Sequence, residues 1–295
     1  MFSMQNFLVL QSLWAMERRH TDGYELLLEE NIAKIAGAGF GGVSAHCHDR
    51  DSVRRIKKLL PDGCKYYEGQ CFVQTIDDLK PVLEVASEFG VDHLDVHADI
   101  RPRKISDCVS VIEGWQRLAE QITFPVLLET HRDRVTSDLL FTLDLLDQFP
   151  NLQLLGDLSH YMVGREFAWP ISNEIHVQIE RIMDHCWAYH GRVSSPQQIQ
   201  VEISFPQHQQ WVDVFLGWWR NGFQSWRKRA GADATLPFVC ELGPKPYAIT
   251  GPDGNDISDR WNDALVMKKL VQGLWASLSD EFISNHPSSS AVADI

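Results

Sequence analysis

The chain has 295 residues, of which 44% are hydrophobic and 23% are charged, and its formal net charge is -13. This length and composition provide apolar material for one large core, and they are typical of an α/β barrel. The negative charge would repel a phosphate backbone or an anionic membrane surface, and no long basic run offsets it. Nucleic acids and membranes are therefore disfavoured as partners.

The six cysteines are scattered along the chain and form no C-x-x-C pair, which indicates reduced thiols. Residues 1–14 carry no basic n-region, and their apolar stretch is interrupted by Gln11 and followed by Glu17 and Arg18. We therefore expect neither a signal peptide nor a membrane span, and we expect a cytoplasmic protein.

Short apolar runs rich in β-branched and aromatic residues alternate with longer segments of helical periodicity, which is typical of βα units around a parallel sheet. Strands are expected at 7–13, 42–47, 65–73, 93–97, 125–129, 152–157, 186–190 and 237–241. Helices are expected at 24–38, 52–60, 76–89, 106–122, 137–149, 173–185, 207–228 and 258–279. Eight pairs with short linkers favour a closed (β/α)8 TIM barrel over the alternative, a doubly wound open sheet.

The expected barrel forms one domain over residues 1–283, and a polar, Ser-rich tail at 284–295 is expected to be disordered. Two connections that follow expected strands are long, at 159–172 and 242–257. In a barrel, the loops after the strands build the active face. We therefore expect these two loops to border the functional site.

The expected seventh helix carries an aromatic stripe at helical spacing. Most of the stripe is interpreted as core packing, and an excess as a candidate subunit contact in a homodimer. The stripe consists of Trp211, Phe215, Trp218, Trp219, Phe223 and Trp226.

The fifth to eighth expected strands each end in an acidic or imidazole side chain: Glu129, Asp157, His190 and Glu241. A solvated edge charge would explain any one of them, but not four in succession. Carboxylates gathered at one barrel mouth would repel one another unless a cation lay among them. Three carboxylates and one imidazole suit Mn²⁺, Mg²⁺ or Co²⁺, with Zn²⁺ as a further candidate. We therefore expect one divalent metal ion at the mouth.

These residues resemble motifs of the xylose isomerase-like TIM barrel superfamily of sugar phosphate isomerases and epimerases, with its ketose 3-epimerases, inosose dehydratases and endonuclease IV. The resemblance spans nearly the whole chain. Its motifs are the Glu after strand five, D-x-x-H after strand six, His with Arg two residues later after strand seven, and E-x-G-P after strand eight. In this chain they are Glu129, Asp157 and His160, His190 and Arg192, and Glu241 with Gly243 and Pro244.

The resemblance implies that the ion is held by the four strand-end residues and that Glu129 and Glu241 also form the acid/base pair. His160 and Arg192 would hold substrate oxygens. The ion would act as a Lewis acid toward an enediolate, while the glutamates remove and return a proton on opposite faces of the substrate. The expected function is an isomerase or epimerase that acts on a sugar or keto-sugar.

Further polar residues near the expected mouth have open roles. His97 closes the fourth strand and is predicted as a substrate contact, although a remnant of a second metal site and a structural histidine are alternatives. Lys245 begins the last long loop and is also predicted to contact substrate. His46 and His48 have a spacing that allows metal binding on an extended segment, but a role in a loop is favoured.

The segment E-T-H-R-D-R places His131, Arg132 and Arg134 directly after Glu129. These side chains could recognise a substrate carboxylate or hydroxyl, or they could form salt bridges at the entry to a helix. Xylose isomerases proper carry a Lys at the position of His131, so the resemblance does not favour their hydride shift.

The main alternative is a dehydratase or lyase that acts on a keto-sugar or keto-inositol, because expulsion of a β-hydroxyl begins with the same proton abstraction. An endonuclease IV-like activity is disfavoured, because its additional Asp-x-His ligands are missing where this chain reads V-E-I-S-F at 201–205. A non-catalytic ligand-binding barrel is disfavoured as well, since all four mouth residues are present.

Overall fold

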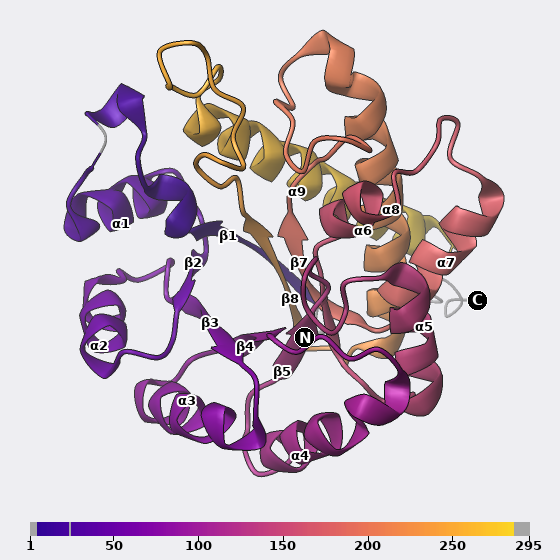
Figure 1. Cartoon of the computed structure of the whole chain (residues 1–295). Coiled ribbons are helices and arrows are strands. Elements are labelled where there is room, and N and C mark those ends of the chain that lie inside the picture. The colour runs from indigo at the N-terminus through magenta and orange to yellow at the C-terminus, as the bar shows by residue number, and fades with distance from the viewer. Residues whose placement is uncertain (1–4, 24, 286–295) are drawn as a thin grey trace, which may run out of the picture.

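The chain folds into a closed barrel of eight parallel strands that pair in chain order, with β8 joined to β1 (Figure 1). The computed structural model describes residues 5–23 and 25–285. The strands are β1 Asn6–Ser12, β2 Gly42–His46, β3 Tyr66–Val73, β4 His93–Ala98, β5 Val126–Glu129, β6 Leu154–Gly156, β7 Cys186–Gly191 and β8 Thr235–Cys240. The predicted (β/α)8 barrel is confirmed, and the open sheet is excluded.

Helices surround the barrel and alternate with the strands along the chain. They are α1 Leu28–Gly37, α2 Arg50–Leu59, α3 Ile76–Phe89, α4 Val109–Ala119, α5 Leu139–Gln148, α6 Ser159–Gly164, α7 Asn173–Met183, α8 Gln209–Arg229 and α9 Arg260–Asn285. Short 3-10 helices lie at η1 Trp14–Met16, η2 His20–Asp22, η3 Ile105–Asp107 and η4 Pro206–His208. Each predicted strand and helix therefore has its counterpart in the structure.

Two predicted boundaries need correction. The expected loop at 159–172 begins with the short helix α6, whose side chains Tyr161 and Met162 are buried. The Tyr161 hydroxyl lies 3.0 Å from Thr142 Oγ1 of α5. Six residues are too few for a periodic pattern, so this helix depends on tertiary contacts.

The second correction concerns the end of the chain. Helix α9 continues to Asn285, two residues into the tail predicted at 284–295. Residues 286–295 of that predicted tail lie outside the described residues.

Local sequence fixes several helix starts. At α3, the Thr75 hydroxyl accepts a hydrogen bond from the Asp78 amide, while the Asp78 carboxylate accepts one from the Thr75 amide. Asp49, Asp138 and Ser172 cap α2, α5 and α7 in the same way, each through a side-chain oxygen. Such caps satisfy backbone amides that the first helical turn leaves without partners.

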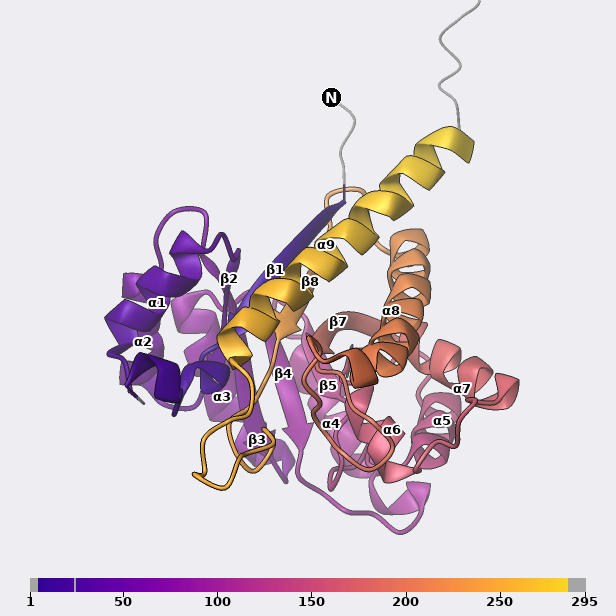
Figure 2. The same ribbon diagram turned by 90° about the horizontal axis from the view of Figure 1, so that it is seen from above.

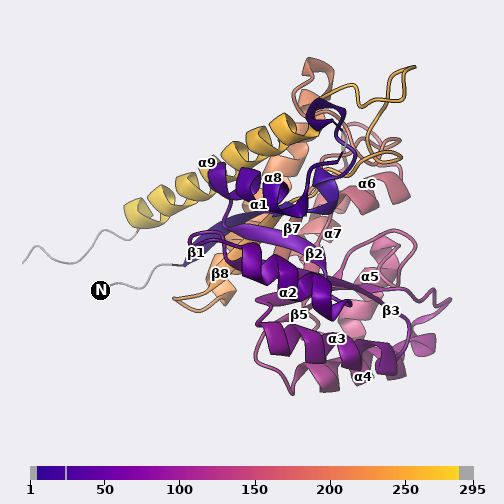
Figure 3. The same ribbon diagram turned by 90° about the vertical axis from the view of Figure 1, so that its left-hand side faces the viewer.

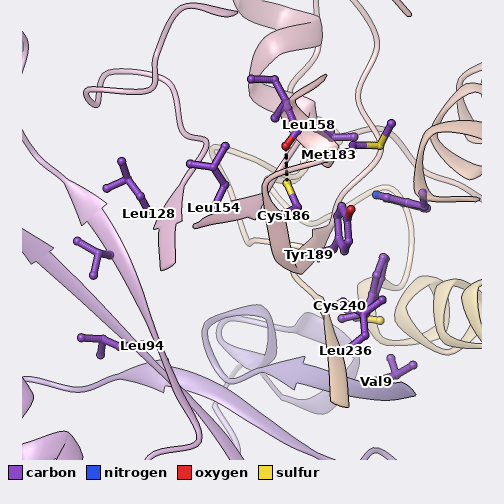
Figure 4. Packing of buried hydrophobic residues seen from close by; sticks show 14 of the residues in the cluster. Val9, Leu94, Leu128, Leu154, Leu158, Met183, Cys186, Tyr189, Leu236 and Cys240 are labelled. Carbon is purple, nitrogen blue, oxygen red and sulfur yellow. Dashed lines mark hydrogen bonds between the residues drawn. The ribbon is translucent and has the colours of Figure 1, made fainter. Parts of the chain in front are cut away.

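Side chains alternate along each strand between the outer helices and the barrel interior. The outward side chains join one large hydrophobic core with the helices, and Figure 4 shows part of it around Leu94, Leu128 and Leu154. The inward side chains Leu127, Leu155 and Ala188 form a small separate apolar cluster. The interior is therefore apolar near β5, β6 and β7, and polar groups occupy other strands.

The aromatic stripe of α8 packs inside the chain. All six of its aromatic side chains are buried, so the interpretation as core packing is confirmed. Phe215 and Trp219 pack against each other, and Trp219 meets Phe238 of β8 edge-on at 5.0 Å between ring centroids. The stripe thus leaves no aromatic surface for a subunit contact, and the homodimer remains a prediction without an assigned surface.

The six cysteines are free and buried, as expected for reduced thiols. Among the described helices, none combines the length and apolar character needed to cross a bilayer. Helix α9 is long, but it lies along the outside of β1 and β8 (Figure 2).

The close approach of α8 to β7 gives a test of the packing. A Cβ at Gly222 would fall onto the Tyr189 hydroxyl and lie 3.1 Å from Met183 Sδ, whereas a Cβ at Gly217 would meet nothing within 4 Å. We expect Gly222→Ala to lower the free energy of unfolding by about 1–3 kcal/mol through overpacking. Gly217→Ala, in the same helix, should raise it by up to about 1 kcal/mol. Chemical denaturation of both variants checks this, and equal effects would contradict the packing.

Candidate metal centre

The carboxyl ends of the strands meet at one mouth of the barrel, where the loop after β8 and helix α6 also lie (Figure 3). Glu129 ends β5, Asp157 follows β6, His190 lies in β7 and Glu241 follows β8. All four side chains are buried. One potential ligand atom from each of them lies within 4.8 Å of those of the others. The structure therefore brings together the four residues that the sequence singled out.

Like charges dominate this cluster, and the imidazole offsets part of the repulsion. Burial alone would raise the pKa of the Glu241 carboxyl, but His190 and Arg192 lower it to about 2. Burial raises the pKa of Asp157 to about 6. Burial would lower the pKa of His190, yet the Glu241 and Glu68 carboxylates hold it well above its usual value. The cluster thus strongly favours a positive charge at its centre.

Arg192 lies over two of the four residues and is itself buried. Its Nη1 donates to Asp157 Oδ2 at 2.6 Å, and its Nη2 donates to Glu241 Oε2 at 2.7 Å. The guanidinium also stacks on the Tyr247 ring at 4.7 Å. Arg192 is therefore held in a fixed orientation, two residues beyond His190 toward the mouth.

The donor set fits one divalent ion. Metal–ligand bonds of about 2.0–2.2 Å place ligand atoms within roughly 4.4 Å of one another, and the ligand atoms of this cluster lie within 4.8 Å of one another without an ion to draw them together. The buried Glu129 Oε2 makes no hydrogen bond in the described residues. A carboxylate-rich set of this kind suits a hard cation such as Mn²⁺ or Mg²⁺.

A second layer of polar residues lies deeper in the barrel, below the four mouth residues. One carboxylate oxygen of Glu68 in β3 lies 2.8 Å from His190 Nε2, and the other lies 2.7 Å from His93 Nε2. His93 Nδ1 lies 3.2 Å from the Tyr66 hydroxyl. With its Nε2 directed to Glu68, His190 turns Nδ1 toward Glu129 and Glu241, at 3.2 and 3.1 Å. Carboxylates of this kind commonly orient metal-binding histidines.

The sequence analysis missed Glu68, His93 and Asp95. The signal was present, because Glu68 and Gln70 in β3 and His93, Asp95 and His97 in β4 alternate with residues of the outer core. Register pairs Glu68 with His93 and Gln70 with Asp95 across the two strands. Polar residues at every second strand position indicate a polar barrel interior.

His97 lies between two carboxylates rather than in an open substrate pocket. Its Nδ1 is 2.7 Å from Glu129 Oε2, and its Nε2 is 3.0 Å from Asp95 Oδ2. Burial would lower the pKa of His97, but these carboxylates raise it to about 10. His97 therefore lies at the mouth, as predicted, and contacts Glu129 and Asp95 there.

His160 lies behind His131, with 3.8 Å between the ring centroids. It is fully buried, and its Nε2 is 3.4 Å from Asp157 Oδ2 and 3.3 Å from Arg192 Nη1. Burial lowers the pKa of His160 well below its usual value and that of His131 to about 4. Both imidazoles are therefore neutral at physiological pH.

The remaining predicted residues lie around the rim. Lys245 is exposed, and its Nζ donates to the Gly254 carbonyl of the same loop at 3.3 Å. Arg132 stacks on the Tyr247 ring at 4.9 Å. Arg134 forms a salt bridge with Asp99 at 2.9 Å, which is one of the two roles expected from the sequence. His46 is exposed and forms part of no candidate metal group in the described residues.

Known proteins resemble this chain in fold rather than in sequence. Comparison with protein-family models and with curated proteins finds no match. A solved structure titled as a xylose isomerase-like TIM barrel protein from Mycobacterium smegmatis, in complex with magnesium, matches with a TM-score of 0.57 and 10% identity, over 92% of this chain and 97% of its own. This chain has the xylose isomerase-like TIM barrel fold.

Two further structures with the xylose isomerase-like fold are similar. D-psicose 3-epimerase, determined in the presence of D-fructose, has a TM-score of 0.57 and 11% identity, and the match covers 91% of this chain and 99% of that one. The probable 3-DHS dehydratase involved in petrobactin synthesis from Bacillus anthracis has a TM-score of 0.52 and 15% identity, with the same coverage. Structures of this fold therefore include an epimerase and a protein described as a dehydratase.

The contact between Glu68 and His190 gives the second prediction. Glu68→Gln should weaken divalent-metal binding by about 10- to 100-fold, because the amide no longer fixes the orientation of His190. Competition with a chelating dye measures the affinity. Tyr66→Phe removes a hydroxyl one contact farther away and is the control, with unchanged affinity expected. An unchanged affinity of Glu68→Gln would show that Glu68 does not position His190.

Proposed function

We propose that this protein is a divalent-metal-dependent isomerase or epimerase that acts on a sugar or keto-sugar by proton transfer next to a carbonyl. The observation that carries the proposal is the pair Glu129 and Glu241, two buried carboxylates that converge from β5 and β8 on one donor set with Asp157 and His190. Its neighbours in fold include an epimerase, which supports the same chemistry.

In the proposed mechanism, the metal ion and the two glutamates have different roles. A divalent ion held by the four residues would polarise the substrate carbonyl and stabilise the charge of an enediolate as a Lewis acid. Glu129 and Glu241 reach the donor set from strands on different sides of the barrel, so one can remove a proton and the other can return it on the opposite face. Their low pKa values keep both carboxylates ionised, as binding of a cation requires.

Arg192 and His160 would orient the substrate. The Arg192 guanidinium bonds to both Asp157 and Glu241 and packs against the Tyr247 ring, so it lies beside the position of a substrate held at the donor set. His160 is neutral and carries an Nδ1 atom without a hydrogen-bond partner in the described residues. A polar partner from the substrate would satisfy that atom. The proposed substrate is therefore a small polyhydroxylated carbonyl compound, in keeping with the negative charge that disfavours nucleic acid.

The test replaces each glutamate by glutamine. The amide oxygen can still coordinate an ion, but loss of acid/base help should reduce turnover by roughly 10²- to 10⁴-fold. With one base removed, exchange of the substrate α-hydrogen with deuterated water should persist from one epimer and disappear from the other. NMR of a ketose panel with both variants measures the exchange, and elemental analysis confirms that the metal is retained.

Glu202→Gln is the matched control, because Glu202 is a buried carboxylate that belongs to none of the candidate metal groups. It should turn over substrate like the unmodified protein. Loss of exchange from both epimers in both glutamate variants, with metal bound, would point to a single base or a hydride shift and would exclude the two-base mechanism.

A dehydratase acting on a keto-sugar or keto-inositol is the second candidate. It is favoured by His131, a neutral imidazole that stands next to Glu129 and offers a further acid/base group. One neighbour in fold is also described as a dehydratase. Incubation with keto-inositols, followed by ultraviolet absorbance of the enone, separates the two. Enone formation without exchange of the α-hydrogen between epimers would identify the protein as a dehydratase and refute the epimerase proposal.

A further inference from the structure

The donor set is covered on the side of the mouth. Glu129, Asp157, His190 and Glu241 are at most 5% exposed, and Arg192 beside them is 2% exposed. In this arrangement a sugar-sized molecule cannot reach the four carboxylate and imidazole groups. The proposed function, on which this step rests, requires such contact, so part of the cover has to move.

Tyr247 contributes to the cover from the β8–α9 loop, which projects from the mouth end of the barrel (Figure 3). The Arg192 guanidinium lies over the Tyr247 ring at 4.7 Å, and the Arg132 guanidinium lies over the same ring at 4.9 Å. Trp14 meets the ring edge-on at 5.1 Å. Trp14, Arg132 and Arg192 follow β1, β5 and β7, so one phenol ring joins segments from four strands across the mouth.

Other parts of the cover are built into the body of the protein. In α6, Tyr161 and Met162 are fully buried and belong to the hydrophobic core. In the loop after β5, Val135 is also part of the core, and its amide donates to the Ala98 carbonyl at 3.1 Å. Displacement of either segment would expose apolar side chains to water, which makes such a movement costly.

The β8–α9 loop is different in this respect. The structure describes all of residues 245–259, and none of them belongs to the hydrophobic core. Ala248 alone among them is buried. The Ile257 amide donates to the Ile249 carbonyl at 3.1 Å, so the loop closes on itself. Such a segment can move without uncovering the core or breaking this internal hydrogen bond.

The two ends of the loop are held in place. Arg260, the first residue of α9, donates to the Leu242 carbonyl at 3.2 Å and also bonds to the Asp256 carboxylate. Gln200 Nε2 donates to the Gly243 carbonyl at 3.1 Å. The loop is therefore fixed at its base, and between these points the Tyr247 ring contacts the guanidinium groups of the mouth.

We propose that residues 244–255 form a gate to the donor set, and that Tyr247 is the residue that holds the gate closed. Movement of its ring away from Arg132 and Arg192 opens the mouth. A cation–π contact changes an equilibrium constant by roughly 2- to 30-fold, so the closed form dominates while the open form stays accessible. Opening also uncovers Arg192, so admission and orientation of the substrate are one event.

The kinetics of metal binding test the gate with Co²⁺ alone as the probe. Stopped-flow mixing with Co²⁺ gives the association rate, and mixing of the loaded protein with excess chelator gives the dissociation rate. Tyr247→Ala should raise both rates by the same factor, roughly 2- to 30-fold, and leave Kd unchanged, because a gate alters the barrier and not the end states. Tyr247→Phe keeps the ring and should behave like the unmodified protein.

Ile257→Ala is the matched control, since Ile257 lies in the same loop and is 42% exposed. Its two rates should equal those of the unmodified protein. A changed Kd of Tyr247→Ala with an unaltered association rate would make Tyr247 a support of the donor set, and it would overturn the gate. Equal rates in all variants would overturn it as well.

Fluorine NMR of protein labelled with 3-fluorotyrosine tests the movement without any metal. The chain has six tyrosines, and Tyr247→Phe identifies the Tyr247 resonance by its loss. This resonance should show relaxation dispersion on the μs–ms timescale, whereas that of the fully buried Tyr161 should show none. Arg132→Ala removes one of the two guanidinium contacts and should increase the open population by roughly 2- to 30-fold.

A Tyr247 resonance without exchange in both the unmodified protein and Arg132→Ala would refute the gate. This measurement depends neither on a bound ion nor on turnover. A protein that shows the movement but binds no ion, or converts no ketose, would therefore lose the proposed function and keep the gate.

Discussion

Five carboxylates buried in one barrel interior are the constraint on which the rest of this structure depends. Glu68, Asp95, Glu129, Asp157 and Glu241 are all at most 5% exposed. Several buried like charges are costly unless each meets a partner, because the low-dielectric interior neither solvates nor screens them. The protein provides these partners as three imidazoles and one guanidinium, which come from β4, β7 and the residue after β7. A cation at the mouth would add further positive charge.

The apolar and the charged side chains of the barrel interior come from different strands. Leu127, Leu155 and Ala188 fill the interior on the side of β5 to β7, while β3 and β4 bring polar side chains to the same depth. Glu129 lies where the two halves meet, two residues beyond Leu127 in β5. Each polar residue is therefore set by strand register, which is more precise than placement on a loop.

The sequence predicted the eight βα units and the four strand-end residues, because both depend on local patterns: apolar runs, their period, and the residue type at each run's end. The polar residues of the inner layer could not be predicted from such local patterns. Glu68 and His93 lie within strands, and only the barrel closure shows that their alternate positions face a common interior. Helix α6 was missed for a related reason, since six residues such as Tyr161 and Met162 become helical through burial rather than propensity. The position of His131 over His160 depends on a loop turn that residue types do not determine.

The pairing of the first strand with the last has a consequence for biosynthesis. β1 pairs with β8 over six residue pairs, from Asn6 with Thr235 to Gln11 with Cys240. Any sheet that forms before β8 leaves the ribosome has two unpaired edges, and such edges are prone to aggregation. Glu241 follows β8 directly, so the same event that closes the sheet delivers the last of the four candidate ligands. Closure of the barrel and completion of the candidate metal site are therefore a single late step.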